Sequence, residues 1–135
     1  MSNINIQKYY WRHKRGELFS TIQNIKLLKL KNLCYNKIKK PSRIHKSKIY
    51  GYKNNKKYQI VVVKIQKSVN KKKARKGKIF GKNVNQGTLK RKRNINFTGK
   101  AIIKVLKKYK PMKIIGIYWI NENINYRFYE IILIK

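Results

Sequence analysis

Acidic residues are almost absent from this chain. Its 135 residues include no Asp and three Glu (Glu17, Glu122 and Glu130), against 37 Lys and Arg, which gives a formal net charge of +34. So few carboxylates cannot neutralise that many cations, and the mutual repulsion of the cations costs free energy in a compact state. The compensating negative charge is therefore expected to come from a partner.

The same scarcity excludes several kinds of catalytic site. A two-metal nuclease needs a cluster of carboxylates, which three scattered Glu do not supply. One Cys and two His (Cys34, His13 and His45) are too few for a zinc site. No Asp can orient either His in a catalytic triad, and neither a Walker loop nor a nucleophile elbow occurs. We therefore predict no enzymatic activity, no metal, no cofactor and no small-molecule substrate.

Cysteine and long apolar runs are also scarce. Cys34 cannot form an internal disulfide, and because its neighbours are apolar it is predicted to be a small buried side chain. The longest apolar runs, such as 60–63 and 131–134, have only four residues and are too short for a membrane-spanning helix. No signal peptide is recognised, so a reducing compartment is expected.

Periodic apolar residues are present in the N-terminal part. Residues 18–38 repeat apolar side chains at about helical spacing with lysines between them, which predicts one long amphipathic helix. Pro41 follows this segment. Residues 39–57 mix Pro, Ser, Gly and Asn with further lysines and are predicted to form a loop that lies on a partner.

The remaining pattern indicates a small sheet and one more helix. Residues 58–67 are rich in β-branched side chains and predict a strand that is apolar on both faces. A short helix is expected to begin at an N-cap, Thr98. Residues 113–120 and 126–134 are predicted to be two strands joined by a linker of hairpin length. These elements indicate an α+β domain in which a small antiparallel sheet carries helices on one face.

Basic clusters with interleaved aromatic side chains occur between those elements. Lys and Arg side chains bind backbone phosphates, and aromatic rings stack on unpaired bases, so such clusters predict RNA binding. The first candidate residues are Trp11, Arg12, His13, Lys14, Arg15, Lys39, Lys40, Arg43, His45, Lys46, Lys48 and Tyr52. The second group is Lys71, Lys72, Lys73, Arg75, Lys76, Lys78, Lys90, Arg91, Lys92 and Arg93. Tyrosines inside the predicted strands are expected to pack in the core instead: Tyr58, Tyr118, Tyr126 and Tyr129.

Several motifs occur in an order that resembles one known family. They are Trp11 and Arg12 before a long helix, then Pro41, Ser42, Arg43 and Lys46, then Gly51, Tyr52, Lys53 and the strand from Tyr58. After these come Lys76, Gly77, Phe80, Gly81, Lys82, Asn85 and Gln86, and finally Tyr118, Trp119 and the segment 126–134. Over nearly the whole chain this series resembles large-subunit ribosomal protein fifteen of the eukaryotic and archaeal type. Members of that family continue beyond the last strand into a long basic tail, whereas the sequence here ends at Lys135.

The resemblance implies a structural role. It implies a four-stranded antiparallel sheet with helices, embedded in large-subunit ribosomal RNA beside other ribosomal proteins, without catalytic residues. It adds Lys53, Lys82, Asn85 and Gln86 to the candidate RNA-binding residues. The protein is then expected to be a constituent of the large subunit in cytoplasmic ribosomes, with a part in subunit assembly and translation.

The expected organisation is a single ribosomal-protein domain, 1–135. In it, 1–40 is a helical arm, 41–57 and 68–97 are basic RNA-contacting loops, and 58–67 with 98–135 are the core. Within the basic loop, residues 70–78 carry Lys where relatives are richer in Arg, Gly and Pro.

Two other functions would share the charge. A DNA-binding or chromatin protein would be basic, but no recognition helix with base-reading polar residues is seen. A membrane-active cationic polypeptide would also be basic and amphipathic, yet it would not need loops punctuated by glycine or a terminal hairpin. Ribosomal RNA and neighbouring ribosomal proteins are therefore the expected partners, and a membrane is not.

Overall fold

The computed structural model describes residues 3–13, 17–30, 33–67 and 95–135. Its elements are α1 (Asn3–Arg12), α2 (Glu17–Leu30), β1 (Tyr35–Ile38), α3 (Ile44–Ile49), β2 (Tyr58–Gln66), α5 (Phe97–Lys108), β3 (Lys113–Glu122) and β4 (Tyr126–Ile134). The predicted α+β class and the four-stranded antiparallel sheet are confirmed.

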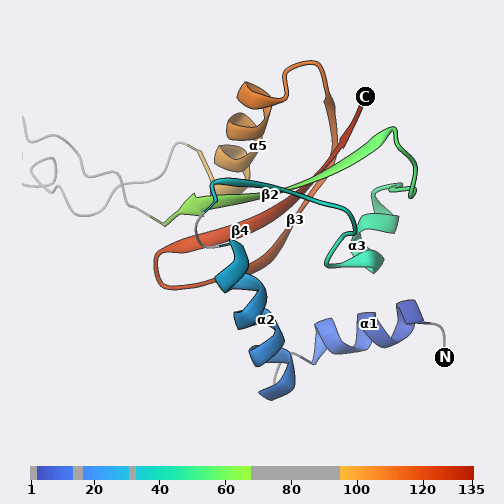
Figure 1. Ribbon diagram of the computed structural model, residues 1–135, viewed down its shortest axis with the longest axis vertical. Helices are drawn as coiled ribbons and strands as arrows, with labels where there is room; N and C mark the ends of the chain where they lie inside the picture. Colours follow the sequence, from blue (N-terminus) through green and yellow to red (C-terminus); the bar gives the residue numbers. More distant parts are fainter. Residues whose placement is uncertain (1–2, 14–16, 31–32, 68–94) are drawn as a thin grey trace, which may run out of the picture.

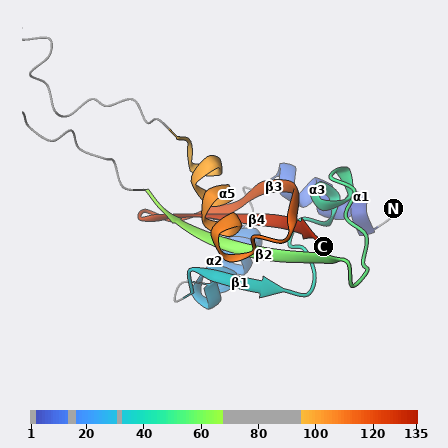
Figure 2. The same cartoon turned by 90° about the horizontal axis from the view of Figure 1, so that it is seen from above.

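The strands follow the order β1-β2-β4-β3, and each neighbouring pair is antiparallel. β2 and β4 are the interior strands, with Val61 opposite Ile131. Residues 60–63 are buried on both sides of the sheet, which explains why β2 shows no alternation of apolar and polar residues. Figure 2 shows β1 and β3 at opposite edges of the sheet.

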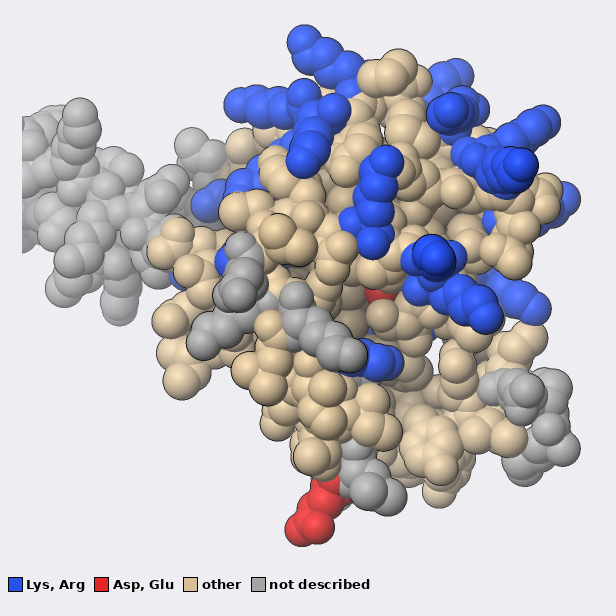
Figure 3. Space-filling model, in the orientation of Figure 1, with Lys and Arg blue, Asp and Glu red and all other residues tan. Residues whose placement is uncertain are grey.

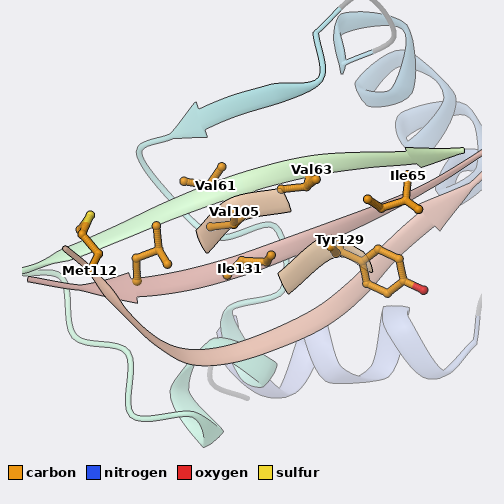
Figure 4. Packing of buried hydrophobic residues seen from close by; sticks show 9 residues of the cluster. Val61, Val63, Ile65, Val105, Met112, Tyr129 and Ile131 are labelled. Carbon is orange, nitrogen blue, oxygen red and sulfur yellow. The ribbon is translucent and has the colours of Figure 1, made fainter. Parts of the chain in front are cut away.

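One face of the sheet is covered by α5. Ala101 and Val105 of this helix are fully buried against side chains of β2 and β4. Figure 4 shows this layer, with Val61, Val63 and Ile131 converging on Val105. The apolar face of α5 therefore supplies the main core, because a helix and a sheet each bury one face against the other.

The other side of the sheet faces α1, α2 and α3 (Figure 1). Helices thus lie on both sides of the sheet rather than on one face as predicted, because the buried strands have an apolar face on each side. Trp11 of α1 and Leu30 of α2 pack against a second, smaller apolar cluster. The buried members of that cluster are Val62, Ile120 and Phe128. This second layer brings the N-terminal helices beside β2, β3 and β4.

The long helix predicted for residues 18–38 is wrong in its last part. α2 ends at Leu30, and Tyr35–Ile38 instead forms the edge strand β1, from Tyr35 opposite Val63 to Ile38 opposite Ile60. Pairing with β2 satisfies the backbone of this short segment and outweighs its local helical spacing. Cys34 precedes this edge strand and is exposed, so the prediction of a buried thiol is also wrong.

Two further details differ from the prediction. The segment 39–57 is not a loop throughout, because it contains α3. α5 is capped by Asn96 rather than Thr98, since the Asn96 side chain accepts a hydrogen bond of 2.6 Å from the Gly99 N–H. The predicted packing of the strand tyrosines is confirmed for Tyr118 and Tyr129, which are buried.

Candidate nucleic-acid interface

The described RNA-binding candidates lie at the end of α1, within α3 and on either side of α3. They are Trp11, Arg12, His13, Lys39, Lys40, Arg43, His45, Lys46, Lys48, Tyr52 and Lys53. The other candidates lie outside the described residues: Lys14, Arg15, Lys71, Lys72, Lys73, Arg75, Lys76, Lys78, Lys82, Asn85, Gln86, Lys90, Arg91, Lys92 and Arg93. The surface formed by α1 and α3 is therefore the part of the candidate interface that lies within the described residues.

A buried carboxylate holds the start of the α3 segment. Glu130 of β4 is 0% exposed, and both of its oxygens accept a hydrogen bond from the Ser42 N–H at 3.1 Å. Burial raises the pKa of the Glu130 carboxyl above its ordinary value, although the hydrogen bonds from Ser42 act in the opposite direction. The segment that carries Arg43 is thus fixed to the middle of the sheet.

Aromatic packing holds the end of the same segment. The ring of Tyr50 stacks on that of Tyr118 in β3, with 6.3 Å between the ring centroids. Gly116 permits this approach, because a Cβ at position 116 would overlap Tyr50. The hydroxyl oxygen of Tyr118 is buried and lies near the Glu130 carboxylate. Burial first, and then the nearby charge of Glu130, raise the pKa of this hydroxyl well above 10.

Arg43 is fixed by two contacts. Its Nη1 donates a hydrogen bond of 3.1 Å to the backbone oxygen of Trp119, and its guanidinium lies 4.2 Å from the centre of the Trp11 ring. Partial burial lowers the pKa of Arg43, while the nearby Tyr118 and Glu130 oppose that shift. The rings of Phe19 and Trp11 also pack edge to face, at 5.3 Å between centroids. Trp11 therefore supports an arginine, and its contact with RNA stays a prediction.

A pocket of about 210 Å³ lies between α1 and α3. Its lining residues are Lys8, Trp11, Arg12, Arg43, His45 and Lys46. No carboxylate lines it, so its electrostatic potential is strongly positive. Four of the predicted residues, together with Trp11, are thus brought into one site from two segments that lie far apart in the sequence.

Lys8 is the lining residue that the sequence analysis missed. Lys8, Trp11 and Arg12 are spaced as i, i+3 and i+4, and this spacing places their side chains along one face of α1. The spacing was available in the sequence as a signal. It indicates a shared face only if the segment Asn3–Arg12 is recognised as a helix of its own.

His45 lies within this cationic group. Its pKa is lowered from the ordinary value of 6.5, first by burial and then by the charges of Lys8, Lys46, Arg12 and Arg43. The imidazole is therefore predominantly neutral at pH 7 in the free protein. Its protonation depends on whether those charges are neutralised.

A second hollow, of about 510 Å³, lies near the hairpin between β3 and β4. Glu122 lines it and pairs with Arg127 at 2.6 Å and Lys67 at 3.5 Å. Arg127 also lies over the ring of Phe97 at 4.4 Å. The cations at this hollow already have a carboxylate, unlike those between α1 and α3, so the latter pocket is the better candidate for an anion.

Other cations and aromatic rings extend the surface. Figure 3 shows Lys and Arg spread over the upper part of the face in view, above the region of α1 and α2. On α1, Tyr9 and Tyr10 are 61% and 57% exposed and can receive unstacked bases. His13 packs against Tyr9, with 4.2 Å between ring centroids.

Neither a metal site nor a membrane span is found in the described part of the chain. Within it, no three metal-ligating side chains come together. No helix among residues 3–13, 17–30, 33–67 and 95–135 has the length and apolar character needed to cross a bilayer.

Comparison with known proteins gives one consistent family. The family model described as ribosomal L15 matches residues 2–135. The chain is 30% identical over 124 residues to large ribosomal subunit protein eL15 of Tetrahymena thermophila, which covers 91% of this chain and 61% of that protein. It is 27% identical over 125 residues to large ribosomal subunit protein eL15z of Picea mariana, with 92% and 61% covered. The chain thus spans about 61% of the length of these relatives.

Proposed function

Since the chain belongs to the ribosomal L15 family, we propose that it is a structural constituent of the large ribosomal subunit. In this role it binds large-subunit ribosomal RNA and contacts neighbouring ribosomal proteins in cytoplasmic ribosomes. It contributes to subunit assembly and translation by stabilising folded RNA, without catalysing a reaction.

The observation that carries the proposal is how the three acids of the chain are used. Glu130 is buried and Glu122 is paired with Arg127 and Lys67, which leaves only Glu17 to offset the other 35 of the 37 Lys and Arg. RNA offers one phosphate per nucleotide, and each neutralised phosphate releases a condensed counterion. A folded RNA is therefore a suitable source of the missing negative charge.

The basic segments are the proposed contact surfaces. Residues 39–53 are held against the sheet by Glu130 and by Tyr50, so their cations are presented in a fixed arrangement. The second basic region, 68–97, is proposed to contact RNA through its clustered Lys and Arg. Fixed cations lose less conformational entropy on binding than cations of a free chain, which favours structured RNA as the partner.

Sedimentation tests the ribosomal assignment. A tagged copy of the chain in a cell extract should migrate with large subunits on a sucrose gradient at moderate salt. Migration with chromatin would instead support the DNA-binding alternative and overturn the proposal. Pelleting with membrane vesicles would overturn it as well.

Binding to purified large-subunit RNA tests the contact surface. If about eight to ten cations meet phosphates, the logarithm of the affinity should fall against the logarithm of the salt concentration with a slope on the order of −6 to −9. Replacing Lys39, Lys40 and Lys48 by Gln should weaken binding and make this slope shallower by about 2.

The matched control removes the same charge from α5 and the residues after it. Lys104, Lys107 and Lys110 are exposed like the three lysines near α3, so their replacement by Gln changes the net charge equally. This control should retain more of the affinity and more of the slope. Equal losses in both variants would mean that the α3 segment has no special part in binding.

A further inference from the structure

The pocket between α1 and α3 has the composition of an anion site. Lys8 and Arg12 come from one turn of α1, while Arg43, His45 and Lys46 come from α3 and the residue before it. Bringing these side chains together costs electrostatic free energy, and the lining contains no carboxylate to offset this cost. An anion between the two helices would remove the repulsion.

Arg43 gives this site a fixed donor. Its guanidinium is held by Trp11 and by the backbone of Trp119, so it does not have to be ordered when a ligand enters. A guanidinium has five N–H donors in a planar fork that matches two oxygens of a phosphate. The hydrogen bond to Trp119 uses only one of its terminal nitrogens, Nη1. The flexible Lys8 and Lys46 add charge around this rigid centre.

We propose that this pocket binds a single RNA backbone phosphate and that His45 takes up a proton when the phosphate enters. The inference rests on the proposed function, because the phosphate is supplied by RNA. A phosphodiester carries one negative charge and two free oxygens, which suits one guanidinium together with flanking ammonium groups. The site would thereby fix the position of α1 and α3 on the RNA backbone without reading its sequence.

Proton uptake follows from the surroundings of His45. The charged groups that act on it are Lys8 and Arg12 of α1, together with Arg43 and Lys46, and all of them disfavour the imidazolium. A bound phosphate offsets these charges and favours the protonated form, so the pKa of His45 is higher in the complex than in the free protein. Affinity for RNA should therefore increase as pH falls from the pKa of the complex towards that of the free protein, and then level off.

The experiment follows the two imidazoles of the full chain by NMR, with 15N-labelled histidine. The probes are inorganic phosphate and a twelve-nucleotide oligouridylate. The oligonucleotide should raise the pKa of His45 by about 1 to 2 pH units, as an opposite charge nearby does. His13 is the comparison, because it hydrogen-bonds to the backbone oxygen of Tyr9 on the same surface but does not line the pocket. Its imidazole signals should respond less to the oligonucleotide than those of His45. The variant His13→Gln assigns the two signals.

Two variants test the pocket by affinity. His45→Gln should make oligouridylate binding nearly independent of pH between pH 5.5 and 7.5 while leaving most of its salt dependence. Lys8→Gln, on the surface of α1, should reduce the salt slope by about 1 and should also raise the pKa of His45 in the free protein. The Lys8 variant is useful because it leaves the contacts of Arg43 intact.

The outcomes separate the inference from the proposed function. Strong, salt-dependent RNA binding with an unchanged pKa of His45 would overturn the phosphate site and leave the RNA-binding role standing. A shift caused by inorganic phosphate but not by the oligonucleotide would overturn RNA as the source of the anion. Failure to bind either the oligonucleotide or ribosomal RNA at low salt would overturn both.

Discussion

Glu130 has a position unlike that of any other acid in the chain. It lies opposite Val62 on one side and Tyr118 on the other, at the middle of the sheet, and is fully buried. Burying a carboxylate is costly unless hydrogen bonds compensate for the lost water. Here both oxygens accept from the Ser42 N–H, next to the arginine that lines the pocket. One residue of the core therefore helps to determine where a residue of the proposed interface lies.

The raised pKa of Glu130 predicts a pH dependence of stability. Because the folded-state pKa lies above the ordinary value of 4.5, the associated stability is fully present below pH 4.5. It is lost as pH rises through the higher pKa of the folded state. Urea unfolding across this range should show that loss in the natural sequence and much less of it in Glu130→Gln.

Glu130→Ala is the counterpart of that variant. It removes the acceptor of the Ser42 N–H, so we expect a loss of about 1 to 3 kcal/mol in the free energy of unfolding. Glu130→Gln keeps an oxygen at that place and should be more stable than Glu130→Ala at every pH. Equal stability of the two variants would mean that the bond to Ser42 contributes nothing.

At the scale of elements, α3 is held on β3 by a close approach of two residues. Tyr50 follows α3 and lies over Gly116, where a larger residue has no room. Its ring stacks almost parallel to that of Tyr118, with 5° between the planes. The absence of a side chain at position 116 is therefore a requirement of the contact between the helix segment and the sheet.

Gly116→Ala should displace Tyr50 and loosen this contact. Overpacking of this kind costs about 1 to 3 kcal/mol in the free energy of unfolding, which chemical denaturation measures. Ile124→Ala is a suitable control, because Ile124 is 92% exposed in the hairpin. If the Gly116 variant were as stable as this control, the packing of Tyr50 against β3 would not contribute to the fold.

Local patterns were sufficient for the elements that carry a clear pattern of their own. β3, β4 and α5 were predicted within a few residues, because alternation, turn residues and helical periodicity are local signals. β1 was missed because its pairing partner, β2, begins 20 residues after β1 ends. Its four residues carry no clear strand pattern of their own, and only the neighbouring strand determines their conformation.

The candidate site shows the same limit at the scale of the whole molecule. Arg12, Arg43, His45 and Lys46 were predicted to bind RNA from their charge and context, and they line one pocket. Their convergence depends on the packing of α1 beside α3, which residue types alone do not reveal. Sequence reasoning could find the cationic residues, whereas their grouping around one space required the fold.

The net charge of +34 predicts how the isolated protein responds to salt. Repulsion among the cations opposes the compact state, and at about 0.1 M salt the screening length falls to about 10 Å. Raising sodium chloride from 20 to 300 mM should therefore increase the free energy of unfolding in urea, by on the order of 1 kcal/mol, or about 4 °C in the melting temperature. Sodium sulfate at equal ionic strength is the comparison, because an additional gain with sulfate would indicate binding of the anion beyond screening. A decrease in stability with chloride would mean that the few ion pairs, such as that of Arg127 with Glu122, outweigh the repulsion.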